Sequence, residues 1–157
     1  MRLSGSCHCG AVRFTVDSAT PVPYQRCYCS VCRKTQGGGG YAINLGADAS
    51  TLVVEGRENT AIYHARIDGE ESAAERHFCR LCGSHLWLFD SRWPDLVHPH
   101  ASAIDSDLPV ATETTHIMLG SRAGWVDVDE RPRDRRHDGY PAESIDEWHT
   151  RTGNRAK

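Results

Sequence analysis

Seven cysteines are the residues of this chain whose types and spacing best suit chemistry, and they occur in three tight groups. An odd number of cysteines cannot pair completely within one chain, and a cytoplasmic protein keeps its thiols reduced. The spacing therefore predicts metal ligands, with zinc as the metal, rather than disulfides. The groups are Cys7-His-Cys9, Cys27-Tyr-Cys29-Ser-Val-Cys32 and Cys79-Arg-Leu-Cys82.

Glycine divides the three groups into two kinds. The first and third groups continue as Cys9-Gly10 and Cys82-Gly83, whereas the middle group continues into Arg33-Lys34. A glycine at this position suits a tight turn whose backbone N–H groups face the sulfur atoms. We therefore expect a closed, structural four-thiolate zinc site that ties the start of the chain to its middle, formed by Cys7, Cys9, Cys79 and Cys82.

The middle group is left with three ligands, Cys27, Cys29 and Cys32. A zinc ion held by three protein ligands keeps one position for water or substrate, which is the arrangement used in catalysis. The basic residues that follow favour an anion such as a thiolate or carboxylate. The glycine run after them would let a ligand approach the backbone; the alternative is that this run is simply a flexible loop. We expect substrate contacts at Arg33, Lys34, Gly37, Gly38 and Gly39.

Two alternatives remain open for the middle group. A histidine such as His8, His77 or His85 would close it as a second structural site, and the chain has nine histidines. Alternatively, Cys27 or Cys29 is a free, redox-sensitive thiol. A middle group closed by a histidine and a middle group with an open position both predict two zinc ions per chain.

The elements that must position these groups are short strands, because apolar and polar residues alternate with a period of two. Such strands are predicted at 11–17, 51–55, 61–67, 86–89 and 125–128. Short helices or turns are expected after Cys29 and near 144–149, and loops at 36–40, 90–99 and 101–109. His98 and His100 would serve as acid or base if held inside the fold, although loop histidines are usually exposed. Strands this short need cross-links, which metal sites supply.

Length and composition fit one small globular domain. Hydrophobic residues make up 39% and charged residues 25% of the 157 residues, and no stretch has the length of a membrane span. The net charge of −3 gives no reason to expect nucleic-acid binding. Without an apolar leader at the N-terminus, a cytoplasmic location is expected. We expect a zinc domain over residues 1–130 and a C-terminal extension over residues 131–157.

The residues around the three groups follow a recognisable pattern in order and separation. They read Gly5-Ser-Cys7-His-Cys9-Gly-Ala-Val-Arg-Phe14, Cys27-Tyr-Cys29-Ser-Val-Cys32-Arg-Lys-Thr-Gln-Gly-Gly38 and Phe78-Cys79-Arg-Leu-Cys82-Gly-Ser84. Together they resemble the glutathione-dependent formaldehyde-activating family, from about residue 4 to about residue 130. Later residues fit more loosely, with 103–105 similar to a turn of the family and 116–125 similar to its closing strand.

The resemblance implies a mainly β, β-tent fold of antiparallel strands around zinc, with few short helices. It also implies structural roles for the first and third groups and a catalytic role for the middle group. The implied activity is that of a carbon–sulfur lyase joining formaldehyde and glutathione as S-hydroxymethylglutathione. Two departures concern the substrate rather than the fold: Tyr28 stands where many members have histidine, and the pattern does not require residues 131–157.

A competing reading is a non-catalytic, zinc-stabilised binding or thiol-carrier module. The same domain type occurs in centromere protein V, a centromere-associated protein of animals. A scaffold has no need for an open three-thiolate site beside Arg33 and Lys34, and a chromatin-binding one would have a basic face, against the net charge of −3. We therefore favour an enzyme acting on a small thiol and a small aldehyde, with no nucleic-acid or membrane partner.

Overall fold

The computed structural model describes residues 1–36, 38–111 and 113–154, which are mainly strands arranged in three sheets. The first sheet has the order β1 (Arg2–Ser6), β2 (Arg13–Asp17), β6 (Val53–Glu55). The second has the order β5 (Ala47–Asp48), β10 (Leu96–Pro99), β9 (His85–Asp90), β8 (Glu70–Cys79), β7 (Thr60–Ile67). The third has the order β12 (Arg135–Arg136), β11 (Thr114–Ile117), β3 (Tyr24–Cys27), β4 (Ala42–Asn44). The predicted mainly β fold class is confirmed.

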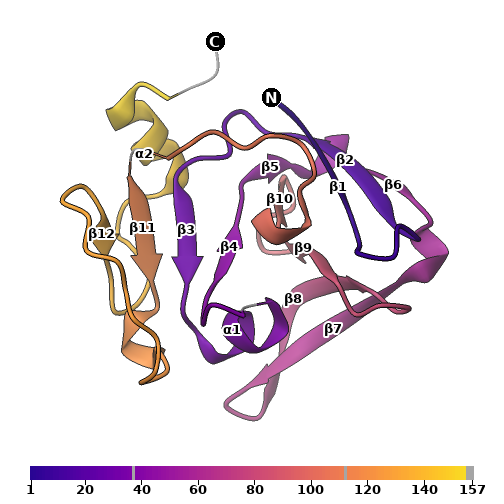
Figure 1. The fold of residues 1–157 in the computed structure, drawn as a ribbon, viewed down its shortest axis with the longest axis horizontal. Helices are drawn as coiled ribbons and strands as arrows, with labels where there is room; N and C mark the ends of the chain where they lie inside the picture. The colour runs from indigo at the N-terminus through magenta and orange to yellow at the C-terminus, as the bar shows by residue number, and fades with distance from the viewer. Residues whose placement is uncertain (37, 112, 155–157) are drawn as a thin grey trace.

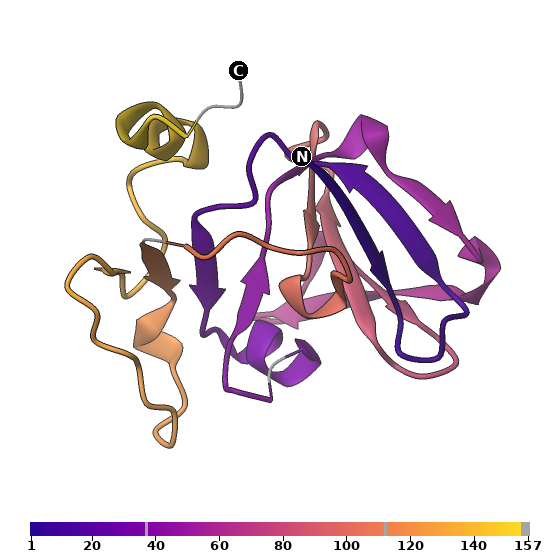
Figure 2. The same cartoon turned by 45° about the horizontal axis from the view of Figure 1, so that its top comes forward.

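Helices are few and short, as predicted. Helix α1 (Ser30–Gln36) follows directly from the end of β3, and α2 (Ile145–Thr152) lies near the start of β3 (Figures 1 and 2). Among the described residues, neither helix is long and apolar enough to cross a membrane. Short 3₁₀ turns complete the elements: η1 (Ala49–Thr51), η2 (Arg57–Asn59), η3 (Ala101–Ala103) and η4 (Leu119–Ser121).

The main core lies between the first and second sheets. Alternate residues of β1 and β2 point inward, and the register pairs Leu3 with Val16. The Phe14 ring of β2 meets the Trp87 ring of β9 edge-on, with ring centroids 5.3 Å apart. These buried apolar side chains hold the two sheets together through the hydrophobic effect.

Gly5 lets the segment after β10 lie directly against β1. A Cβ atom at this position would come within 2.4 Å of the Ala103 carbonyl oxygen and 2.5 Å of Phe14 Cζ, so only glycine fits. Gly5 forms a backbone bridge to Ile104, and the Asp105 N–H donates to the Ser4 carbonyl at 2.8 Å. This contact fixes η3, which forms one wall of the groove described below.

The C-terminal segment joins the third sheet through parallel pairing. Strand β11 pairs in parallel with both β3 and β12, in contrast to the antiparallel pairing of the other strands in the described ranges. Helix α2 begins with a capping box of Ser144 and Glu147, and Trp148 Nε1 donates to Glu113 at 2.7 Å. Residues 131–152 therefore pack on β3 and β11; the division of the chain at residue 130 stays a prediction.

Three segments differ from the sequence-based expectation. Residues 125–128, predicted as a strand, form no strand: they follow a turn at 124–125, where the Val126 N–H donates to the Ala123 carbonyl at 3.1 Å. Their alternation arises because Val126 is buried against Gly40 while Trp125 is 67% exposed. The expected loop at 90–99 contains β10, and the expected closing strand at 116–125 ends at Ile117, before Met118 turns the chain at φ +60°.

Candidate metal centres and adjoining groove

The first candidate metal centre consists of two two-cysteine turns that the first and second sheets bring together. One turn follows β1, and the other begins at the last residue of β8. The Sγ atoms of Cys7 and Cys9 are 3.5 Å apart, and those of Cys9 and Cys79 are 3.8 Å apart. Four Sγ atoms lie within 4.8 Å of one another, a spacing that could hold a metal ion, and they belong to Cys7, Cys9, Cys79 and Cys82.

The glycine after each turn has the backbone conformation that its position requires. Gly10 and Gly83 have φ of +74° and +77°, in the left-handed region that favours glycine. Each closes its turn by donating its N–H to a cysteine carbonyl, Gly10 to Cys7 at 2.9 Å and Gly83 to Cys79 at 2.8 Å. A hydrogen bond to Ser84 lowers the pKa of Cys82 to about 5, which favours the thiolate form.

The second candidate metal centre lies where β3 meets α1. Cys27 ends β3, Cys29 lies just before α1, and Cys32 is in its first turn. Their three Sγ atoms lie within 4.8 Å of one another, and the Cys32 N–H donates to Cys29 Sγ at 3.3 Å. Cys27 and Cys32 are buried, whereas Cys29 is half-buried.

No histidine, aspartate or glutamate joins this second group within the described part of the chain. Of the histidines considered as a fourth ligand, His77 stacks on Trp87 and bonds Glu75 at 2.9 Å, while His8 and His85 line the groove. Hydrogen bonds from Cys27 and Cys32 lower the pKa of Cys29, and the hydrogen bond to Cys29 raises the pKa of Cys27. Cys29 is therefore the thiol of this group that ionises most readily, and a bound cation would release protons from the group.

A hydrogen-bond chain connects this group to the interior. Asn44 Nδ2 donates to Cys32 Sγ at 3.9 Å, and Asn44 Oδ1 accepts from His100 Nδ1 at 3.1 Å. The Gln36 amide nitrogen donates to His100 Nε2 at 2.8 Å. These partners assign the proton of His100 to Nδ1, and complete burial keeps the pKa of His100 well below its ordinary value. His100 is therefore a buried, neutral positioning residue rather than an exposed loop histidine.

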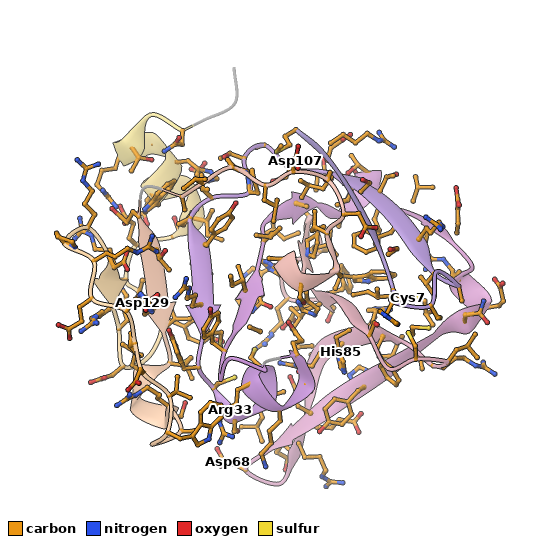
Figure 3. The ribbon with its side chains drawn as sticks, in the orientation of Figure 1. Cys7, Arg33, Asp68, His85, Asp107 and Asp129 are labelled. Atoms are coloured by element: carbon orange, nitrogen blue, oxygen red, sulfur yellow. The ribbon has the colours of Figure 1, made fainter. Side chains whose placement is uncertain are left out.

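A groove of about 790 Å³ lies between α1, the first cysteine turn and η3. In Figure 3, Arg33 is on α1, and His85 lies between α1 and Cys7. Of the predicted substrate contacts, Arg33, Lys34 and Gly38 line the groove, Gly39 does not, and Gly37 falls outside the described residues. The described lining is Ser6, Cys7, His8, Arg33, Lys34, Thr35, Gln36, Gly38, Gly83, Ser84, His85, Ser102, Ala103 and Asp105.

Sequence reasoning did not identify the polar residues that join the two regions. Gln36 both lines the groove and bonds His100, so it links the groove to the three-cysteine group through Asn44. A glutamine or asparagine carries no spacing signal of the kind that identifies metal ligands. The half-buried positions of Asn44 and Gln36 could be found only from the tertiary structure.

Comparisons with known proteins identify the family of the chain. Residues 2–121 match the family model described as glutathione-dependent formaldehyde-activating enzyme. The chain is 63% identical over 153 residues, 98% of each chain, to a protein of Halomonas elongata whose name provisionally assigns it that activity. A solved structure of a Rhodobacter sphaeroides protein is similar with a TM-score of 0.52 and 30% identity, covering 68% of this chain and 91% of that one. The chain belongs to the glutathione-dependent formaldehyde-activating enzyme family.

Proposed function

We propose that this protein joins a small thiol, with glutathione the leading candidate, to formaldehyde or another small aldehyde. The observation that carries the proposal is the group of Cys27, Cys29 and Cys32, whose Sγ atoms lie within 4.8 Å of one another without a fourth protein ligand in the described chain. Membership of the family and the name of the Halomonas elongata relative support the same activity.

The donor set fits zinc. Soft thiolates are ligands that zinc prefers, and three of them leave a position for a further ligand. Cys27, Cys29 and Cys32 would hold this ion, and Cys7, Cys9, Cys79 and Cys82 would hold a second, structural one. Zinc in the three-cysteine group would lower the pKa of an incoming thiol, so that the thiolate forms at neutral pH.

The chain's own residues bind and orient the reactants. Arg33 and Lys34 line the groove and attract an anionic thiol such as glutathione. Asn44 and His100 hold Cys32 in place through the hydrogen-bond chain. In the reaction, the thiolate sulfur forms a bond to the aldehyde carbon, and the carbonyl oxygen takes up a proton. The overall reaction adds S–H across C=O, so it needs no oxidant or reductant.

A thiol carrier without catalysis is the alternative that the same site could serve. Thiols add to formaldehyde without help, and three thiolates place negative charge around the metal, which weakens it as a Lewis acid. Reversible thiol binding is the easier task for such a site. The distinction therefore rests on a rate: the enzyme accelerates adduct formation, whereas a carrier binds the thiol with the uncatalysed rate unchanged.

The test is to count zinc per chain by elemental analysis on protein purified without chelator, before and after adding glutathione. We expect two zinc ions per chain, one of which becomes labile or changes its coordination with glutathione. Stopped-flow measurement of adduct formation from glutathione and formaldehyde then distinguishes enzyme from carrier. A single zinc ion that glutathione leaves unaffected would contradict the proposal.

A further inference from the structure

Buried polar atoms without partners gather beside the groove. In the described chain, six side-chain nitrogen or oxygen atoms are buried without a hydrogen bond, and five of them belong to α1, β8 and β9. Leaving such atoms unpaired is costly, so a cluster of them at a groove indicates that a ligand supplies their partners. They are Arg33 Nε, Gln36 Oε1, Arg76 Nε, Arg76 Nη1 and His85 Nδ1.

Arg76 is the member of this cluster with the most buried nitrogen atoms that lack a hydrogen-bond partner. Its residue is only 7% exposed, and among the described side chains no carboxylate forms an ion pair with it. The nearby acids are already engaged: Glu75 points to the other face of β8 and bonds His77, and Asp90 pairs with Arg92 at 2.6 Å. A buried charge without a carboxylate partner is unfavourable, so the position of Arg76 favours the binding of an anion.

The strand register places Arg76 on the groove side of the second sheet. Strand β8 pairs regularly with β7 from Glu75 to Cys79, so Arg76 and Phe78 share a face. The Phe78 ring stacks on His85, which lines the groove, with ring centroids 5.3 Å apart. Arg76 therefore lies on the same face as the groove wall.

The electrostatics of the neighbours agree with this position. Burial, and then the positive charge of Arg76, lower the pKa of His85, so His85 is neutral at neutral pH. Burial, and to a smaller extent the charges of His85 and Arg76, lower the pKa of His100. The guanidinium therefore lies close to His85 of the groove wall and to His100, and both of these histidines are neutral at neutral pH.

We propose that Arg76 binds a carboxylate of the substrate pair. A guanidinium matches a carboxylate through two parallel N–H···O hydrogen bonds, and burial strengthens this pairing. The groove of about 790 Å³ falls within the range of small-molecule sites and is far larger than formaldehyde requires. The described groove lining contains two basic residues, Arg33 and Lys34, and one acid, Asp105, so the groove as a whole favours anions.

The inference rests on the proposed function and names the charge that a reactant must carry. Two sources fit the same chemistry. The carboxylate belongs to the thiol, as in glutathione, or to the carbonyl partner, as in an oxo acid such as glyoxylate. Formaldehyde itself has no charge for Arg76 to bind, so the two sources predict different responses when Arg76 is replaced.

The first arm measures binding of S-methylglutathione to the zinc-loaded protein by calorimetry. This probe keeps both carboxylates but has no free thiol, so the result does not depend on thiol chemistry and is separate from the test of the proposed function. If the carboxylate is that of the thiol, Arg76→Gln should raise the Kd by roughly ten- to a hundredfold. The matched control is Arg2→Gln, which removes the same charge at an exposed site paired with Asp17.

The second arm uses a thiol without a carboxylate, 2-mercaptoethanol, and compares glyoxylate with formaldehyde as the carbonyl partner. If the carboxylate is that of the carbonyl partner, Arg76→Gln should lower kcat/KM for glyoxylate by a similar factor and leave formaldehyde unchanged. Either arm succeeding supports the site and identifies its source. Unchanged S-methylglutathione binding together with unchanged glyoxylate selectivity would overturn the proposal.

Two further measurements keep the test decisive if Arg76→Gln folds poorly. Arg76→Lys keeps the positive charge but lacks the two parallel N–H donors of the guanidinium. This variant should bind the carboxylate ligand more weakly than wild type but more tightly than Arg76→Gln. The wild-type protein should also bind the diethyl ester of S-methylglutathione more weakly than the free acid when the thiol is the source. If Arg76→Gln loses zinc from the three-cysteine group while ligand affinity per loaded site stays unchanged, Arg76 serves only as a counter-charge, and the proposal fails.

Discussion

At the scale of single residues, the environment of Cys32 depends on side chains that are distant in sequence. Its sulfur accepts from Asn44, which is oriented by His100, which in turn accepts from Gln36. Partners of this kind fix the orientation of metal ligands and adjust their electron density. Cys32 could be predicted from its spacing, whereas the amide that orients it could not, because Asn44 lies on strand β4 and Cys32 in helix α1.

Replacement of Asn44 should therefore weaken metal binding without unfolding the protein. Asn44→Ala removes the N–H donor to Cys32 and frees His100, and we expect the zinc affinity of the three-cysteine group to fall about 10- to 100-fold. Competition with a chromophoric chelator measures this directly. Asn154→Ala, in the C-terminal segment, is the matched control. Equal zinc affinity in Asn44→Ala and wild type would contradict a positioning role.

At the scale of elements, close packing of β1 on η3 sets the shape of the groove. Gly5→Ala places a methyl group within 2.4 Å of the Ala103 carbonyl oxygen, so β1 or η3 must move. We expect a loss of about 1–3 kcal/mol in the free energy of unfolding, measured by denaturant titration. Gly139→Ala adds the same methyl group where nothing lies within 4 Å and should change stability little. Equal stabilities of the two variants would show that the contact is not restrictive.

The C-terminal segment is attached to the third sheet through a buried carboxylate. Asp134 accepts from the Thr114 N–H at 3.0 Å, from Arg131 Nε at 3.2 Å and from His116 Nε2 at 3.3 Å. Burial raises the pKa of Asp134, but these hydrogen bonds outweigh it and the net pKa is lowered. The segment is thus held by a charged group whose stabilising effect depends on pH.

Acid should release this attachment. Because the pKa of Asp134 is lower in the folded than in the unfolded protein, its contribution is complete above the unfolded value of about 3.9 and is lost as the pH falls through the folded value. We expect the free energy of unfolding of wild type to fall below about pH 4, and Asp134→Asn to show a shallower dependence. Equilibrium unfolding at several pH values between 2.5 and 6 measures both. Parallel curves for the two proteins would refute this role of Asp134.

At the scale of the whole molecule, the two cysteine groups belong to different parts of the fold. The four-cysteine group connects β1 to β8 and β9 beside the main core, which includes Cys7 and Cys79. The three-cysteine group lies in a smaller cluster with Ala42 and Ile117. A metal in the four-cysteine group would cross-link the two sheets that enclose the core. A metal in the three-cysteine group would hold only the end of β3 and α1.

Loss of one ligand should consequently have different effects in the two groups. The apparent binding energy of a structural zinc, about 10–16 kcal/mol, is comparable to the whole stability of a domain, so Cys79→Ser should unfold the protein. Cys29→Ser should lose one zinc ion and remain folded. Zinc content and circular dichroism of both variants measure this. The proposed division of roles fails if both unfold to the same extent.

The sequence alone predicted the candidate metal ligands, because within each of the three sequence clusters (7–9, 27–32 and 79–82) the cysteines are at most five residues apart and stay close in any local turn. The alternating strands 11–17 and 61–67 were predicted for the same local reason, while 125–128 misled because one buried valine next to a turn can imitate a strand. Only the tertiary structure brought Gln36 to His100, 64 residues away, and left two side-chain nitrogen atoms of Arg76 buried without a hydrogen bond. Burial and pairing of a polar side chain depend on contacts between distant elements, and no local pattern contains them.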